Sequence, residues 1–343
     1  MPQICGHAGA VTFARNEPSV EYRTLRRTGL RVSRLGFGCG NLGGLMVRGT
    51  PAEQERAVAR AVELGITYFD TAPMYGDGQS ETNLGRVLAA LRPDIVLATK
   101  APADPARRGH LRAAIVESAE ASLRRLRRER VDVFQLHTAV TLAGGNGTLD
   151  VPAVIEEVVP AFEALRTAGK IGFYGFSGTG EAAALPQLIA TGAFDVFQCI
   201  YNILNPSAGS APLPRIGPDY ANVLARAGEQ GMGAVGIRVL AGGALSGDMR
   251  RHPIASQRVV PMGTSAGYDG DVAQAQRLAP LVSEQRVASL SEAALRFAIS
   301  HPAISSALIG FSDLAQIEAA ADAESKGPLP PATLERIAEL LPA

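Results

Sequence analysis

The chain has 343 residues, of which 46% are hydrophobic and 19% charged, a composition that excludes extensive disorder and supplies a large core. Its 33 Lys and Arg residues balance 33 Asp and Glu residues, so bulk charge favours neither nucleic acid nor an anionic membrane as a partner. One basic run, residues 123–130, ends a helical pattern, where cations suit the helix dipole. Three scattered cysteines (Cys5, Cys39 and Cys199) are too few for a disulfide framework or a zinc site. We therefore expect a cytoplasmic protein without a metal.

The start of the chain differs from the rest. Residues 1–20 have no charged start followed by an apolar run, so they do not indicate a signal peptide, and we expect a loosely ordered arm there. From residue 21 to residue 343, short apolar runs alternate with segments of helical period, and no linker interrupts them. We expect a single domain over residues 21–343.

Eight short apolar runs are predicted to be strands. They are almost continuously apolar, which is typical of parallel strands covered on both faces. A helical segment follows each run. Eight strand–helix units in succession favour a closed (β/α)8 barrel, with extra helices before the last strand, over an open doubly wound sheet. The expected strands are residues 35–38, 67–70, 94–100, 131–137, 171–177, 194–201, 232–240 and 305–310.

Capping residues mark where several helices begin. The stretch 50–53 (Thr-Pro-Ala-Glu) has the capping-box pattern, and residues 289–292 (Ser-Leu-Ser-Glu) repeat it. We also expect Ser80 to cap the helix after the second strand and Ser312 to cap the last helix. Further helical patterns cover residues 110–128, 152–168, 181–191, 219–230 and 272–285.

Ionisable side chains end three successive predicted strands: Asp70, Lys100 and His137. Singly, each has a structural explanation, since an Asp after a strand commonly caps a turn and a terminal Lys is commonly solvated. In a closed barrel, however, the carboxyl ends of the strands surround one mouth, where barrel enzymes hold their active sites. Tyr75 follows soon after Asp70, and a neighbouring ammonium would lower the pKa of its phenol. We therefore expect a proton relay of Tyr75, Lys100 and Asp70, with His137 donating a hydrogen bond to a carbonyl oxygen.

A glycine pattern near the start suggests a different fold. Gly38, Gly40 and Gly43 match the G-x-G-x-x-G spacing of a dinucleotide-binding turn. That turn requires a helix directly behind the third glycine, whereas the next capped helix is predicted only from Pro51. Glu63 stands about 20 residues after the third glycine, where an acid would bind ribose, but we expect it to face solvent. The pattern therefore does not indicate a Rossmann fold.

The stretches "ITYFDTAPMYGDGQSETNLGRVL", "VLATK" and "DVFQLH", followed in order by "GFYGFSG", "FQCIYN" and "SSALIGFSD", resemble the aldo-keto reductase superfamily over roughly residues 22–322. The resemblance implies a (β/α)8 barrel that binds NADPH, or less often NADH, and transfers hydride to an aldehyde or ketone. By position, Tyr75 would be the general acid/base, Lys100 and Asp70 its tuning pair, and His137 the residue that orients the carbonyl.

The same resemblance implies where the cofactor binds. Ser177 and Gln198 match residues that hold the nicotinamide carboxamide, although Gly178 stands where the family often has Asn. Arg238 falls where many members stack an aromatic ring on the nicotinamide. No Lys or Arg accompanies Ser312, where the family commonly has one. The preference for NADP(H), with NAD(H) as the alternative, therefore rests on the family's habit. The implied cofactor residues are Gly40, Asn41, Ser177, Gln198, Arg238, Leu240, Gly242, Gly310, Ser312 and Gln316.

Three functions are compatible with these residues. The leading hypothesis is a carbonyl reductase or, in reverse, an alcohol or sugar dehydrogenase with a small-molecule substrate. The alternative is a nicotinamide-binding subunit that senses redox state for a partner protein. A metal-dependent lyase on the same fold is disfavoured, because no His/Asp/Glu cluster has metal-ligand spacing. The substrate and the oligomeric state are not predicted from the loops 138–150, 202–220 and 246–271.

Overall fold

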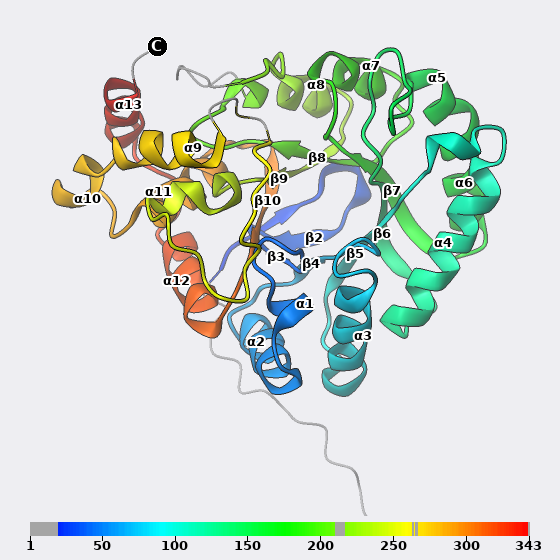
Figure 1. The fold of residues 1–343 in the computed structure, drawn as a ribbon, viewed down its shortest axis with the longest axis horizontal. Helices are drawn as coiled ribbons and strands as arrows, with labels where there is room; N and C mark the ends of the chain where they lie inside the picture. Colours follow the sequence, from blue (N-terminus) through cyan, green and yellow to red (C-terminus); the bar gives the residue numbers. More distant parts are fainter. Residues whose placement is uncertain (1–19, 210–216, 263, 265–266, 342–343) are drawn as a thin grey trace, which may run out of the picture.

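Eight parallel strands close into a barrel in the computed structural model, which describes residues 20–209, 217–262, 264 and 267–341 (Figure 1). Neighbouring strands follow the chain from β3 to β10, and β10 pairs with β3 to close the ring. The expected arm and Cys5 lie outside the described residues, Val20 excepted. The strands are β3 (Leu35–Gly38), β4 (Tyr68–Asp70), β5 (Val96–Ala101), β6 (Val131–Leu136), β7 (Ile171–Ser177), β8 (Val196–Ile200), β9 (Gly233–Ile237) and β10 (Ile304–Gly310).

The (β/α)8 prediction is therefore confirmed, and each of the eight apolar runs forms a barrel strand. The largest difference is at β9, which ends at Ile237 although the apolar pattern runs on to residue 240. Arg238 has a φ of 55°, a left-handed conformation that an extended strand does not contain. The strand therefore stops where the chain turns into the barrel mouth.

Helices surround the strands, and the predicted extra helices before the last strand are present as α9 and α10 (Figure 1). The capping box at residues 50–53 is formed in full. The helices are α1 (Leu45–Arg48), α2 (Pro51–Glu63), α3 (Gln79–Leu91), α4 (Leu111–Leu126), α5 (Val151–Ala153), α6 (Val159–Thr167), α7 (Leu185–Ala190), α8 (Val223–Glu229), α9 (Gly267–Gln276), α10 (Pro280–Ser283), α11 (Leu290–Ser300), α12 (Leu314–Ser325) and α13 (Pro331–Leu340).

Two of the predicted caps are wrong. Gly78, not Ser80, precedes α3, and the Ser80 hydroxyl instead donates to the carbonyl of Cys39 at 2.8 Å. Asp313, not Ser312, caps α12, while the Ser312 hydroxyl donates to the carbonyl of Gly43 at 2.7 Å. Both serines are buried beside the loop that follows β3, so they bind that loop instead of a helix end.

Several elements were not predicted. An antiparallel hairpin, β1 (Tyr22–Thr24) and β2 (Arg31–Ser33), lies behind the barrel and is seen through it in Figure 1. Leu25, from its connection, packs into the barrel interior against Tyr68 and Val235 and so closes that end. Each of these strands contains an arginine, so neither gives the apolar run by which the barrel strands were predicted. The helices α1 and α13 were not predicted either, and α13 follows the last barrel unit.

Period-2 alternation places polar groups above an apolar layer inside the barrel. Tyr68, Ala98 and Val196 belong to one buried cluster in the interior. Asp70, Lys100 and Gln198 stand two residues further along the same three strands and therefore point the same way, one layer closer to the carboxyl ends. The fold thus delivers three polar side chains from β4, β5 and β8 to one level of the mouth.

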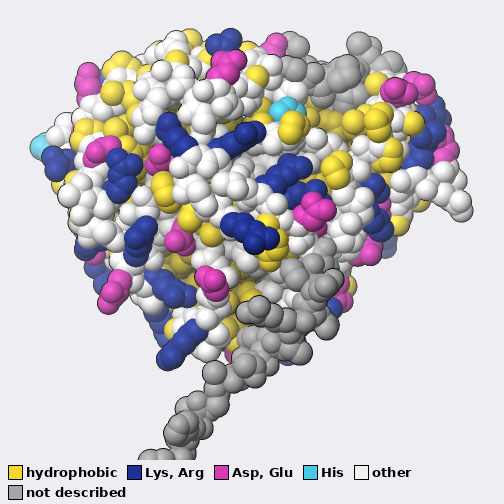
Figure 2. Space-filling view, turned by 180° about the vertical axis from the view of Figure 1, so that it is seen from behind, with side chains coloured by type: hydrophobic (Ala, Val, Ile, Leu, Met, Phe, Trp, Pro, Cys, Tyr) yellow, Lys and Arg dark blue, Asp and Glu magenta, His cyan; other side chains and the backbone are white. Residues whose placement is uncertain are grey.

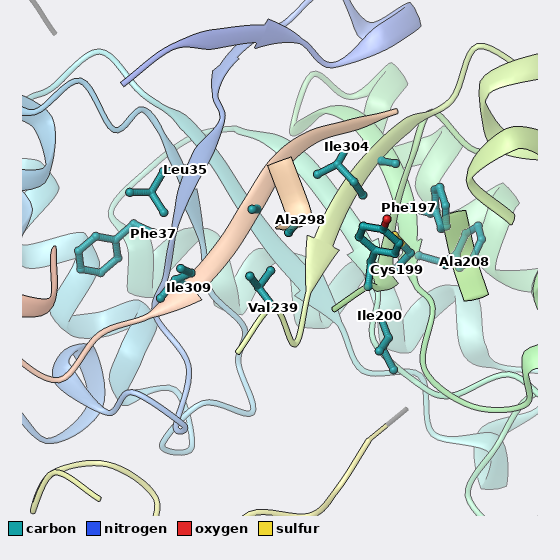
Figure 3. Packing of buried hydrophobic residues seen from close by; sticks show 14 of the residues in the cluster. Leu35, Phe37, Phe197, Cys199, Ile200, Ala208, Val239, Ala298, Ile304 and Ile309 are labelled. Carbon is teal, nitrogen blue, oxygen red and sulfur yellow. The ribbon is translucent and has the colours of Figure 1, made fainter. Parts of the chain in front are cut away.

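The outward-facing side chains of the strands form the larger core (Figure 3). Phe37 of β3 stacks on Phe69 of β4 with ring centroids 5.0 Å apart, and it also touches Phe311 at 5.2 Å. This packing ties the first, second and last barrel strands together directly beneath the loops that bear the mouth residues.

The molecular surface is charged on the side turned away from the viewer of Figure 1. Figure 2 shows Lys and Arg side chains scattered over that face, with Asp and Glu side chains among them. In the basic run, Arg125 binds Glu81, and Arg127 ends α4 in the left-handed conformation. The run is thus the end of a helix, as its periodicity indicates.

Candidate active site

Asp70, Lys100 and Tyr75 form one buried cluster at the barrel mouth. The Lys100 ammonium forms an ion pair with Oδ1 of Asp70, and the two side chains are only 1% and 5% exposed. It also donates to the carbonyl of Thr71 at 2.8 Å and to the Tyr75 hydroxyl at 3.3 Å. These three bonds use all three ammonium protons, so the lysine is fixed between a carboxylate and a phenol.

Burial decides the proton affinities in this cluster. It raises the pKa of the Asp70 carboxyl, although Lys100 acts in the opposite direction. Burial works to lower the pKa of Lys100, but Asp70 and Tyr75 together hold that pKa above its ordinary value. The pKa of Tyr75 is raised by burial in spite of Lys100, so the expectation that the ammonium brings it toward neutral pH is not met here. Tyr75 is therefore protonated at neutral pH.

His137 lies beside Tyr75, directly after β6. The two rings meet edge to face with centroids 5.7 Å apart. Burial, together with the charge of Lys100, lowers the pKa of His137 to about 3, so the imidazole is neutral. Its Nδ1 is buried and has no hydrogen-bond partner among the described residues. A proton on Nδ1 would leave a buried donor unpaired, which favours the tautomer with the proton on Nε2.

Gln198 and Ser177 join this cluster from β8 and β7. Gln198 donates its side-chain amide to Oδ2 of Asp70 at 2.7 Å, and the Ser177 hydroxyl donates to Oε1 of Gln198 at 3.4 Å. Gly178 leaves no room for another side chain here, since a Cβ at that position would lie 2.5 Å from the backbone oxygen of Gln198. The contact that an Asn would supply is therefore absent for a steric reason.

A long cavity of about 730 Å³ starts at this cluster. Asp70, Tyr75 and His137 line one part of it, and Lys100 lies beneath. The cavity runs past the turn Ala241–Ser246 to the beginning of α12. Its walls include every residue that was predicted to contact the cofactor: Gly40, Asn41, Ser177, Gln198, Arg238, Leu240, Gly242, Gly310, Ser312 and Gln316.

The cavity walls fit an extended dinucleotide. Gly242 and Gly243 adopt φ values of 72° and 111°, which place bare backbone at the wall where a phosphate group could approach closely. Arg250, Arg251 and Arg258 also line the cavity and supply positive charge for the phosphate groups of a dinucleotide. Sequence reasoning missed these arginines, because a loop of this length gives no indication of where it folds back.

Arg251 holds the loop of residues 247–262, which contains the three arginines, closed over the cavity. Its guanidinium donates to the carbonyl of Gly242 and to the Tyr268 hydroxyl, both at 2.8 Å. The neighbouring Ser256 hydroxyl donates to the carbonyl of Asn41, in the loop after β3, at 2.9 Å. The loop is therefore joined to both sides of the cavity.

The glycine pattern after β3 contributes to the cavity without forming a Rossmann turn. A one-turn helix, α1, does open just after Gly43, contrary to the expectation that none would precede Pro51. The closed barrel nevertheless excludes the open sheet of that fold. Glu63 is 40% exposed and binds Arg60, so it faces solvent as predicted.

Comparison with known proteins agrees with this geometry. The model of the Aldo/keto reductase family matches residues 34–342. The chain belongs to the aldo/keto reductase family. It is 29% identical over 317 residues to L-galactose dehydrogenase of Arabidopsis thaliana, which spans 87% of this chain and 86% of that protein. It is also 26% identical to a probable voltage-gated potassium channel subunit beta of the same plant, over 94% of this chain and 97% of that protein.

Solved structures give the same result. The holo form of the aldo-keto reductase AKR11C1 from Bacillus halodurans superposes with a TM-score of 0.70 at 27% identity, covering 94% of this chain and 97% of the other. Aldo/keto reductases are oxidoreductases that generally use a nicotinamide cofactor, and this aldo/keto reductase has a cavity suited to one. Within the described part of the chain, no helix could span a membrane, and no three His, Cys, Asp or Glu side chains gather as a metal site.

Proposed function

We propose that this aldo/keto reductase transfers hydride between NAD(P)H and the carbonyl of an aldehyde, ketone or sugar, with Tyr75 as general acid/base. The observation that carries this proposal is the contact of Lys100 with both Asp70 and Tyr75 at the wall of a cavity that His137 also lines. When bound, the nicotinamide supplies or accepts the hydride.

The protein's own residues would handle the proton. In the direction of reduction, Tyr75 donates its phenolic proton to the carbonyl oxygen as negative charge develops there, and Lys100 stabilises the tyrosinate that remains. His137, with its proton on Nε2, donates a hydrogen bond to the same oxygen and orients it. Asp70 keeps the lysine charged and in place. In the direction of oxidation the tyrosinate accepts the proton of the alcohol.

For the cofactor we favour NADP(H), with NAD(H) as the alternative. Ser177 and Gln198 would hold the nicotinamide carboxamide, and the planar guanidinium of Arg238 would lie along the ring. The diphosphate would meet the turn at Leu240 and Gly242, the ribose beside it would meet Gly40 and Asn41, and the adenosine would meet Gly310, Ser312 and Gln316. Residues 310–320, which would meet the adenosine, contain no cation for the 2′-phosphate of NADP(H). Arg258 lines the cavity, and we assign it to that phosphate.

The cofactor preference is tested by binding rather than turnover. The dissociation constants of NADPH and NADH are measured from the fluorescence of the bound nicotinamide, in the native protein and in Arg258→Ala. Tighter binding of NADPH, lost in the variant, supports the assignment. Equal affinities that the variant leaves unchanged would contradict it.

A sugar or alcohol substrate is supported by the similarity to L-galactose dehydrogenase. The test is a panel of aldehydes, ketones and aldoses with NADPH or NADH, and of sugars and alcohols with the oxidised cofactors, followed by nicotinamide absorbance. Turnover of at least one class, abolished in Tyr75→Phe, is the expected result. Full activity of Tyr75→Phe would show that the proposed acid is wrong.

A second candidate is a redox-sensing subunit of a partner protein, which the similarity to the channel subunit supports. This candidate differs from the enzyme in one measurable respect. Such a subunit would bind NADPH tightly and show no turnover across the whole panel. Since the chain retains the four residues proposed for catalysis, we favour the enzyme.

We also propose that the protein is cytoplasmic, as expected from its composition. The two cysteines that the structure describes, Cys39 and Cys199, are both buried and unpaired. The assignment of residues 21–343 to one domain remains a proposal of the same kind. Limited proteolysis of the full chain would test it through the boundaries of the resistant core.

A further inference from the structure

Gln198 occupies a place between the proposed proton relay and the proposed cofactor site. We infer that Gln198 is a positioning residue that orients Asp70 and, through Lys100, Tyr75, with the same amide that faces the nicotinamide carboxamide. The inference rests on the proposed function and deepens it, because it couples the hydride-transfer end of the cavity to the proton-transfer residues through one side chain.

Asp70 shows why a second partner is required. Its carboxylate is buried, and Lys100 binds only Oδ1. Oδ2 is satisfied by the Gln198 amide at 2.7 Å. Without that donor, one oxygen of a buried anion would lose its hydrogen bond, and the carboxylate would be free to turn about its own axis. Gln198 therefore determines which way Asp70 presents Oδ1 to the lysine.

The opposite edge of the same amide faces the cavity. One N–H of the Gln198 amide donates to Asp70, and Oε1 is the atom of this amide that can accept a hydrogen bond from a ligand. The Ser177 hydroxyl reaches Oε1 at 3.4 Å, a long contact that a better donor would replace. A primary carboxamide carries the matching groups, an N–H for Oε1 and a carbonyl for the freed hydroxyl.

A side chain at position 178 cannot take over this role. Gly178 follows Ser177 on β7, and its backbone N–H donates to the backbone oxygen of Gln198 at 2.7 Å. A side chain there would collide with that oxygen. Gln198 itself is only 2% exposed, and its bond to Asp70 fixes the orientation of its amide. Binding at Oε1 and orientation of Asp70 are therefore linked in one rigid group.

The test separates the two roles of Gln198 with a matched control. Gln198→Met keeps the length of the side chain and removes both polar contacts, whereas Ser177→Ala removes only the cavity-side contact. The chain has no Trp and only 7 Tyr residues, so tyrosinate absorbance can be titrated without an indole background. Subtracting the titration of Tyr75→Phe isolates Tyr75. Circular dichroism checks that each variant is folded, and Gln198→Asn provides a milder change if Gln198→Met is not.

We expect both variants to weaken binding of NADPH, the nicotinamide probe, on the order of tenfold, as for a lost hydrogen bond. Only the Gln198 variants should shift the Tyr75 titration upward, since a less firmly held Lys100 stabilises the tyrosinate less. Their kcat should also show the shifted pH dependence.

Two results would overturn the inference. If Gln198→Met weakens NADPH binding but leaves the Tyr75 titration unchanged, the residue is a cofactor ligand and nothing more. If it shifts the titration without changing NADPH affinity, the amide does not serve both sites. Failure of the proposed function is a separate outcome, since full turnover by Tyr75→Phe would disprove the general acid while the titration still reports the coupling.

Discussion

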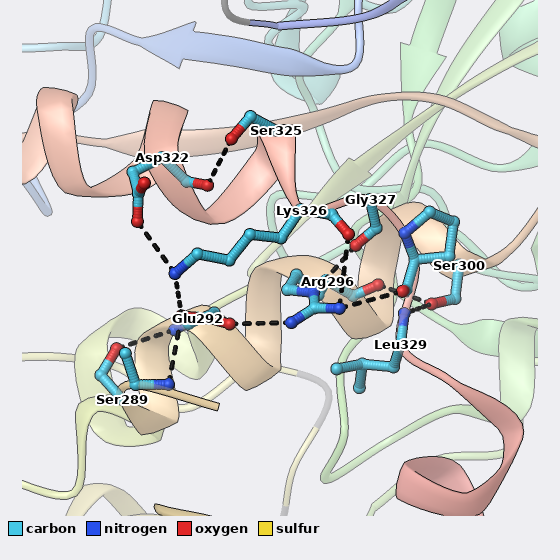
Figure 4. A network of polar contacts seen from close by, with 11 residues as sticks. Ser289, Glu292, Arg296, Ser300, Asp322, Ser325, Lys326, Gly327 and Leu329 are labelled. Atoms are coloured by element: carbon cyan, nitrogen blue, oxygen red, sulfur yellow. Dashed lines mark hydrogen bonds and ion pairs between the residues drawn. The ribbon is translucent and has the colours of Figure 1, made fainter. Parts of the chain in front are cut away.

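Two buried charged clusters in this barrel are built from similar side chains and differ in the partners that their charged groups bind. In the mouth, Asp70 pairs with Lys100 beside Tyr75. Outside the ring of strands, Glu292 of α11 pairs with Arg296 and with Lys326, which follows α12 (Figure 4). Exposure does not separate the clusters, since the Glu292 and Arg296 side chains are only 5% and 9% exposed.

The hydrogen-bond partners of the charged side chains do distinguish the two clusters. Arg296 donates to the backbone oxygens of Gly327 and Pro328, so it ties α11 to the chain after α12 (Figure 4). Hydrogen bonds and charges of its partners hold the pKa of Glu292 below its ordinary value even though burial opposes them. In the mouth, burial prevails and raises the pKa of Asp70. Glu292 also lines the cavity. Its cluster is nevertheless a brace that joins two helices, whereas the mouth cluster ends in a titratable phenol.

The comparison shows that a buried ion pair alone does not identify an active site. What distinguishes the mouth cluster is that one of its hydrogen bonds leads to a group that can exchange a proton with a ligand. Four experiments test this distinction between a catalytic and a structural cluster.

The largest effect is expected from Tyr75→Phe, which should lower kcat by about 10²- to 10⁴-fold, the usual contribution of a general acid. Stability should hardly change, because the hydroxyl makes only a 3.3 Å contact with Lys100. Steady-state kinetics together with thermal unfolding provide the measurement. A variant that unfolds more easily yet keeps its turnover would place Tyr75 in the same class as the brace.

Arg296→Met should have the opposite profile. It leaves Glu292 with Lys326 as its remaining cationic partner and frees the end of α12, so we expect a loss of up to about 3–5 kcal/mol in the free energy of unfolding. Turnover per folded molecule should stay within about twofold, since Arg296 itself does not line the cavity. Urea unfolding and active-site titration measure the two quantities. A large fall in turnover without a loss of stability would contradict the brace.

The pH dependence of the rates of reduction and oxidation should be set by Tyr75 alone in the accessible pH range. Reduction needs the protonated phenol, whose pKa burial raises above its ordinary value near 10, so the rate of reduction should be flat through neutral pH and fall only in alkali. Oxidation needs the tyrosinate and should rise over the same alkaline range. His137 is neutral, with a pKa of about 3, and should add no transition near pH 6.5. A step in either profile near neutrality would contradict this.

The smallest effect is expected from Glu63→Gln, which tests an exposed ion pair against the two buried ones. Glu63 binds Arg60 at 3.2 Å with both side chains well exposed, and such pairs contribute at most about 1 kcal/mol. Affinity for NADPH and NADH should be unchanged. Weaker binding of either cofactor would revive the ribose-binding role that the glycine spacing suggests.

Local patterns were sufficient to predict the barrel strands and the residues at their ends. Side-chain alternation is a property of one strand, so Asp70 and Lys100 could be placed at the mouth without knowledge of their neighbours. The unpredicted hairpin β1–β2 has only three residues in each strand, and its position is held by Leu25 inside the barrel. The caps assigned to Ser80 and Ser312 were wrong because both hydroxyls have partners in a loop distant in sequence.

The fold class, the family and the chemical groups at the mouth could therefore be read from the amino-acid sequence, since strand periodicity and motif spacing are encoded within short segments. How these groups are connected became known from the folded structure alone. The bond from Gln198 to Asp70 joins residues 128 positions apart, and burial by the whole barrel raises the pKa of Tyr75 against the pull of Lys100. Such contacts and burial depend on strands meeting across the barrel, which no local pattern records.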